Sequence, residues 1–219
     1  MENHNIKPPF PAFPTGQTVN GLVSCKELGL VLGYMAAMTR LGHTLMAGIS
    51  LSLGLEESYF AGHYTSDPLI LFRIFNYPPE GAAGFGVGGH TDYGLLTILR
   101  QDMSGGLQIK SKSQWIDAAP IPNSFVCNIG DMLDRITGGH YLSAPHRVRN
   151  STAHNRLSFA FFFDPNFNAE VRPTHRWTGE RQQKERWDRA SVREFSGTYG
   201  DYLLGKVSKV FPDLLRKVL

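Results

Sequence analysis

Residues 84–100, which read GFGVGGHTDYGLLTILR, decide the fold class of this chain. The glycines match the pattern GxGxxG, which in dinucleotide-binding folds is followed by a helix whose N-terminus meets the pyrophosphate. Here they are followed by a run of apolar and β-branched residues from Gly94 to Leu99, which predicts a strand. The glycine pattern is therefore not a dinucleotide fingerprint, and a βαβ fold is not expected.

Similar strand-like segments lie on both sides of this stretch, separated by turns rich in glycine and proline. They are short and rich in β-branched and aromatic residues, and no helical pattern falls between them. They span residues 69–77, 94–100, 106–110, 115–117, 124–127, 146–149 and 156–163. Such a series predicts an antiparallel sandwich or barrel. We therefore expect a mainly β fold with a double-stranded β-helix (jelly roll) core and flanking α-helices.

Two helical patterns flank the predicted strands. Residues 28–55 place apolar side chains on one face at helical spacing, and Gly54 lies where such a helix would end. A second helical pattern falls within residues 191–219 and would pack outside the sheets. Because no linker divides the chain, we predict an irregular N-terminal segment over residues 1–33 and one jelly-roll domain over residues 34–219.

Composition and charge argue against several classes of function. The chain has 219 residues, and its 22 Lys and Arg are mixed among 19 Asp and Glu, so nucleic-acid binding is not expected. Arg40 lies near the middle of the most apolar stretch, which argues against a membrane span. Cys25 and Cys127 are far apart, and residues 1–20 contain no apolar leader segment. We therefore expect a cytoplasmic protein.

Three residues are candidates for a metal site. His90 and Asp92 are two positions apart, and in an extended segment such residues point to the same face. His146 follows a proline at the start of another predicted strand and supplies a third ligand. Two histidines and one carboxylate would leave about three positions of an iron(II) ion open. Catalytic zinc also takes three protein ligands, so these residues alone do not determine the metal.

A second pair of residues favours iron. Arg156 and Ser158 also lie two positions apart on a predicted strand, shortly after His146. An arginine fork with a hydroxyl on the same face is suited to binding a carboxylate. Taken alone, the pair would be a surface arginine and an edge-strand serine, but beside a metal triad the carboxylate anchor is the better interpretation.

The order and spacing of these residues resemble the iron(II)/2-oxoglutarate-dependent dioxygenases of the isopenicillin N synthase-like family. The similarity runs from about residue 34 to residue 212 and is densest between residues 69 and 165. Besides the residues above, it rests on motifs at residues 76–78, 96–97, 101–102, 105–108, 128–131 and 162–165.

The resemblance implies an enzyme that uses iron(II), 2-oxoglutarate and O2, with ascorbate as a candidate reductant. It would oxidise, and by default hydroxylate, a small organic substrate with release of succinate and CO2, and no catalytic residue is expected beyond the metal centre. The implied iron ligands are His90, Asp92 and His146. The implied 2-oxoglutarate residues are Arg156, Ser158 and Tyr77. By strand parity, Arg73 and Phe162 are expected to line the substrate pocket.

The N-terminal part of the chain departs from this family. Members usually have a longer N-terminal region, whereas residues 1–33 resemble nothing in the family. If family strands are missing, one sheet has an exposed edge, so we expect a monomer or a weak homo-oligomer that pairs through this edge. The alternative is a shortened, non-catalytic isoform that binds metal or a protein partner. A zinc hydrolase is more distant because no general base is evident near the triad.

Overall fold

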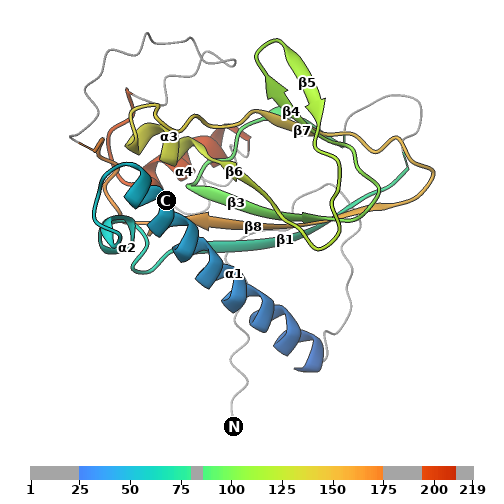
Figure 1. Ribbon diagram of the computed structural model, residues 1–219, viewed down its shortest axis with the longest axis horizontal. Coiled ribbons are helices and arrows are strands. Elements are labelled where there is room, and N and C mark those ends of the chain that lie inside the picture. The colour runs from blue at the N-terminus through green and yellow to red at the C-terminus, as the bar shows by residue number, and fades with distance from the viewer. Residues whose placement is uncertain (1–24, 80–85, 175–193, 211–219) are drawn as a thin grey trace.

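The computed structural model of the protein describes residues 25–79, 86–174 and 194–210. It contains two four-stranded sheets with helices packed around them (Figure 1). In chain order the elements are α1 (Cys25–Ser52), α2 (Tyr59–His63), β1 (Leu69–Tyr77), β2 (Val87–His90), β3 (Leu96–Gln101), β4 (Leu107–Ser111), β5 (Gln114–Asp117), β6 (Val126–Ile129), α3 (Asp131–Ile136), β7 (His146–Val148), β8 (Arg156–Asp164) and α4 (Tyr199–Val210).

The strands form two antiparallel sheets with the orders β1-β8-β3-β6 and β2-β7-β4-β5. Along the chain, the strands alternate between the sheets except at the β4–β5 hairpin, so the last strand, β8, lies between β1 and β3. Among the described residues, β1 pairs only with β8 and forms one edge of its sheet. This arrangement confirms the predicted mainly β jelly roll with flanking helices.

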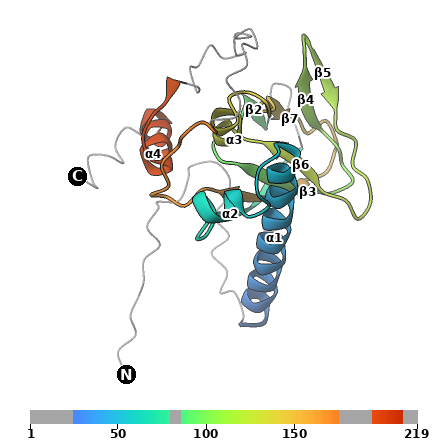
Figure 2. The same ribbon diagram turned by 60° about the vertical axis from the view of Figure 1, so that its left-hand side comes forward.

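Strand β8 separates two hydrophobic clusters because its side chains alternate between two faces. Phe161 and Phe163 point to the outer face, where α1 packs, and the His43 ring lies 5.0 Å from the Phe163 ring. Figures 1 and 2 show α1 lying against this sheet. The residues of opposite parity face the second sheet, and a smaller cluster lies there. It consists of Tyr77, Leu99, Leu107, Val148 and Ala160.

The predicted strands end within about two residues of the observed ones, but three elements were not predicted. Strand β2 has a glycine-rich sequence and exists because it pairs with β7. Helices α2 and α3 are too short to produce a helical period in the sequence. The structure contains no helix in its described part that is long and apolar enough to cross a membrane.

The N-terminal boundary differs from the prediction in part. Helix α1 begins at Cys25, so residues 25–33 are helical and not irregular, while residues 1–24 lie outside the described residues. A helix can extend past the last residue that packs on the sheet because its backbone hydrogen bonds are internal. The second predicted helix, over residues 191–219, corresponds to α4, and residues 191–193 and 211–219 lie outside the described part.

Candidate metal centre

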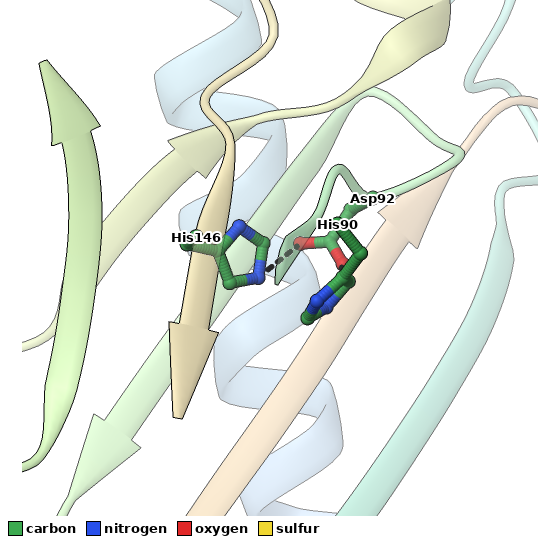
Figure 3. Close-up of side chains that lie close together, drawn as sticks. All are labelled: His90, Asp92 and His146. Atoms are coloured by element: carbon green, nitrogen blue, oxygen red, sulfur yellow. Dashed lines mark ion pairs between the residues drawn. The ribbon is translucent and has the colours of Figure 1, made fainter. Parts of the chain in front are cut away.

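The three predicted metal ligands meet between the sheets (Figure 3). His90 ends β2 and lies directly opposite His146, which begins β7. Asp92 follows β2 in a loop, so it is placed by that loop and not by the extended strand expected from the sequence. One ligand atom from each of the three residues lies within 4.8 Å of the others.

The distances between these atoms suit a single ion. The Nε2 atom of His90 is 3.8 Å from Asp92 Oδ1, and the Nε2 atom of His146 is 3.7 Å from Asp92 Oδ2. Two ligands at about 2.1 Å from one metal ion are roughly 3–4 Å apart. The cluster can therefore hold a metal ion after small adjustments of the side chains.

Backbone carbonyls orient both imidazole rings. The Nδ1 atom of His90 lies 2.8 Å from the Gly88 carbonyl oxygen, and that of His146 lies 2.9 Å from the Ala144 carbonyl oxygen. Because a carbonyl only accepts hydrogen bonds, each Nδ1 carries the hydrogen and each Nε2 keeps a lone pair for a metal. Burial lowers the pKa of His90, and the neighbouring His146 lowers it further, which favours the neutral form that binds metals.

Two donors on neighbouring strands hold the Asp92 carboxylate. Thr97 Oγ1 donates to Asp92 Oδ2 at 2.6 Å, and Asn128 Nδ2 donates to the same oxygen at 2.7 Å. Thr97 and Asn128 are partners in the β3–β6 pair. Both fall in sequence motifs of the resemblance, but their joint contact with Asp92 follows only from the strand register. Asp92 Oδ1 is left as the oxygen most available to a metal.

Arg156 is buried at the start of β8, opposite Tyr77 of β1. Its Nε donates to the Gly105 carbonyl at 2.5 Å, and its Nη2 donates to Gln101 Oε1 at 3.1 Å. Its Nη1 is also buried and has no hydrogen-bond partner among the residues that the structure describes. An unsatisfied buried donor of this kind costs about 1–3 kcal/mol or more, so this nitrogen is available to an acceptor on a bound molecule.

Two hydroxyl groups lie beside this guanidinium. Ser158 and Tyr77 share its face of the sheet and are buried, and their hydroxyls are joined by a hydrogen bond. The Arg156 guanidinium carbon lies 5.2 Å from the centre of the Tyr77 ring. Burial raises the pKa of Tyr77, so its hydroxyl keeps its proton. The structure therefore places the three residues that the resemblance assigns to 2-oxoglutarate in one buried group.

Arg73 and Phe162 lie on the same inner face as this group. Arg73 pairs with Ala160, and Phe162 pairs with Thr97, one of the residues that hold Asp92. Both side chains are half-buried, and burial lowers the pKa of Arg73. The register thus puts both residues on the face that strand parity gave, and their lining of a substrate pocket stays a prediction.

The fold and the site together, a jelly roll with a His-Asp-His cluster and a buried arginine, are typical of one class of protein. Comparisons of this chain with known proteins find the same class. The family model of the 2OG-Fe(II) oxygenase superfamily matches residues 65–165. A 1-aminocyclopropane-1-carboxylate oxidase from Dictyostelium mucoroides is 39% identical over an aligned length of 251. This alignment covers 98% of this chain and 67% of that protein. The chain belongs to the 2OG-Fe(II) oxygenase superfamily, whose members use iron(II), 2-oxoglutarate and O2.

Two further comparisons agree with this family. A Dictyostelium discoideum protein named "Probable iron/ascorbate oxidoreductase" is 50% identical over 210 residues, which cover 86% of this chain and 58% of the relative. The crystal structure of a full-length Neurospora crassa protein in complex with alpha-KG and thymine matches with a TM-score of 0.73 and 27% identity. That match covers 85% of this chain and 58% of the Neurospora protein. The chain thus spans little more than half the length of these two proteins.

Proposed function

We propose that this chain is an iron(II)- and 2-oxoglutarate-dependent oxygenase that oxidises a small organic substrate. Hydroxylation is the expected outcome, with release of succinate and CO2. One observation carries the proposal. A cluster with the ligands of a non-haem iron site shares the space between the sheets with Arg156, whose Nη1 is buried without a partner among the described residues.

The ligand set fits iron(II) on one side of the ion. His90, Asp92 and His146 would hold it and leave about three positions open for the co-substrate and O2. Iron bound there would supply the oxygen chemistry, while the protein supplies orientation and electrostatics. The carbonyl groups behind the two imidazoles leave both Nε2 lone pairs free to bind the ion, and the donors on Asp92 would keep its carboxylate from rotating.

The buried polar group fits the distal carboxylate of 2-oxoglutarate. Arg156 Nη1 would donate a charge-assisted hydrogen bond, and the Ser158 hydroxyl would donate a second one from the same face. The Tyr77 hydroxyl, which is hydrogen-bonded to Ser158, would add a third contact. Because Gly105 and Gln101 fix the other guanidinium nitrogens, the free donor is already oriented before the ligand arrives.

We further propose that the substrate carries a carboxylate bound by Arg73 next to the ring of Phe162. A half-buried guanidinium binds a carboxylate more strongly than an exposed one because less water competes for it. The Dictyostelium mucoroides relative is named for 1-aminocyclopropane-1-carboxylate, which also carries a carboxylate. Arg73 and Phe162 share the inner face with Thr97, so this substrate would approach the metal from the β1 side.

The test is turnover of 2-oxoglutarate by the full chain loaded with iron(II) under O2. Succinate and CO2 should form in the wild type and be lost in His90→Ala and Arg156→Ala. The control is Arg100→Ala, which removes an exposed arginine on β3 and should keep turnover. Absence of turnover with metal bound would refute the proposal. O2 uptake that needs ascorbate but not 2-oxoglutarate would show that Arg156 binds the carboxylate of a molecule other than 2-oxoglutarate.

Several finer expectations remain predictions. They are membership of the isopenicillin N synthase-like family, a cytoplasmic location, ascorbate as reductant, and a monomer or weak homo-oligomer that associates through the edge of β1. The oxidase and oxidoreductase names of the relatives do not favour a non-catalytic isoform. Sedimentation velocity over a range of concentrations would measure the oligomeric state.

A further inference from the structure

Two tyrosines of α4 each donate a hydrogen bond to a buried carboxylate of the jelly roll. Tyr199 Oη donates to Asp164 Oδ2 at 2.6 Å, and Tyr202 Oη donates to Asp131 Oδ2 at 2.6 Å. The tyrosines are three positions apart and therefore lie on one face of the helix. None of the four residues is more than 8% exposed. Short bonds between buried groups are stronger than the same bonds in water.

The first carboxylate holds the backbone that follows Asp92. Asp164 ends β8 and accepts a hydrogen bond from the backbone N–H of Leu95. It also lies against Gly94, where a Cβ atom would overlap the Asp164 Oδ1 atom. Only glycine allows this approach, so the side chain of Asp164 and the backbone two residues after Asp92 are fitted to each other.

The second carboxylate is that of Asp131, whose backbone is hydrogen-bonded to the backbone of Asp92. Asp131 begins α3, and its backbone N–H donates to the Asp92 carbonyl at 2.8 Å. The next amide, that of Met132, donates to the Gly94 carbonyl at 3.0 Å. Figures 1 and 2 both show α4 beside α3, and Lys206 Nζ of α4 lies 4.0 Å from Asp131 Oδ2.

We infer that α4 positions the metal-binding loop, residues 92–95, through the hydroxyls of Tyr199 and Tyr202. Tyr199 acts through Asp164, and Tyr202 acts through Asp131, so both sides of the loop are tied to one helix. The inference rests on the proposed metal centre and adds residues that touch neither metal nor co-substrate. Their role is to keep the Asp92 carboxylate opposite His146, and not to take part in the chemistry.

The test is the affinity for Co(II), followed by its visible absorption spectrum, in Tyr199→Phe and Tyr202→Phe. Each change removes one hydroxyl and keeps the ring. We expect roughly tenfold weaker binding, the lower end of the 10–100-fold found for residues that orient metal ligands. The matched control is Tyr64→Phe, which removes another largely buried hydroxyl, one that donates to the Arg172 carbonyl at 3.0 Å. The control should lose stability but not Co(II) affinity.

A second measurement separates positioning from general loosening of the fold. Hydrogen exchange of the backbone amides of residues 92–95 should become faster in the two α4 variants and stay unchanged in Tyr64→Phe. Tyr199 is fully buried, whereas Tyr202 is 6% exposed and its substitution is better tolerated. If Tyr199→Phe does not fold, Tyr202→Phe alone still tests the inference.

The outcomes distinguish this inference from the proposed function. If wild-type Co(II) binding is absent, or is kept in His90→Ala, the metal centre itself is wrong and the inference fails with it. If binding is lost in His90→Ala, but both α4 variants match Tyr64→Phe within twofold and exchange at the same rate, only the role of α4 is refuted.

Discussion

Asp164 has an environment that is unusual for an acidic side chain. It is buried at the end of β8, and burial, together with a smaller contribution from the Asp92 charge, raises the pKa of its carboxyl to about 7. The hydrogen bonds from Tyr199 and from the Leu95 amide lower it again but do not offset burial. The folded protein therefore keeps the Asp164 proton at pH values where the unfolded chain has released it.

Stability should therefore depend on pH through Asp164. Between pH 4 and pH 7 the unfolded chain binds fewer protons at this carboxyl than the folded protein, so the free energy of unfolding falls as the pH rises. Asp164→Asn removes this contribution. From about pH 4 to pH 7, the free energy of unfolding of the variant should therefore rise relative to that of the wild type by about 4 kcal/mol. This uses about 1.4 kcal/mol per pKa unit.

Urea unfolding of the metal-free protein at several pH values measures this difference. Glu57→Gln, which changes an exposed carboxyl, is the control and should show no such gain. A difference between Asp164→Asn and wild type that is constant from pH 4 to pH 8 would contradict the assignment.

The packing of helix α1 against β8 depends on Gly42. A Cβ atom at Gly42 would lie 2.7 Å from the ring of Phe163, which is fully buried. Alanine there would have to push the helix or the ring, and overpacking costs about 1–3 kcal/mol. Because alanine has a higher helix propensity than glycine, the substitution offsets roughly 1 kcal/mol of that cost.

The expected result is that Gly42→Ala lowers the free energy of unfolding by up to about 2 kcal/mol. The control lies on the same helix, because Gly48 has open space around its Cβ position. Gly48→Ala should raise the stability by about 0.5–1 kcal/mol. Chemical denaturation measures both changes, and equal effects of the two substitutions would show that α1 does not pack on β8 as described.

The whole molecule should be stabilised in two separate steps by metal and by 2-oxoglutarate. A ligand that binds only the folded state at a hundred times its Kd adds about 2.7 kcal/mol. Mn(II) should raise the Tm of the wild type, and 2-oxoglutarate should raise it further. Arg156→Ala should keep the Mn(II) step and lose the 2-oxoglutarate step, because the metal ligands are untouched.

Differential scanning fluorimetry of the full chain resolves these two steps. Arg100→Ala should keep both. A 2-oxoglutarate step in Arg156→Ala as large as that in the wild type would remove Arg156 from the site, while the absence of the Mn(II) step in the wild type would remove the metal centre.

Local sequence patterns predicted most of the strands and the types of residue in the site. The alternation in residues 156–163 was enough to place Arg156, Ser158 and Phe162 on one face, because the side-chain period of a strand is two. The same patterns missed β2, since Val87–His90 is mostly glycine, and they placed Asp92 in a strand that ends at His90.

The sequence by itself determined the class of fold, and it predicted the three candidate metal ligands and the arginine with its serine, because these depend on residue type and on short-range periodicity. Only the tertiary structure decided that β2 pairs with β7, that Thr97 and Asn128 share one oxygen of Asp92, and that two tyrosines of α4 hold the carboxylates beside the metal loop. The physical reason is range. A strand or helix period sets the face on which a side chain lies, whereas its partner depends on strand pairing and packing between segments far apart in the chain.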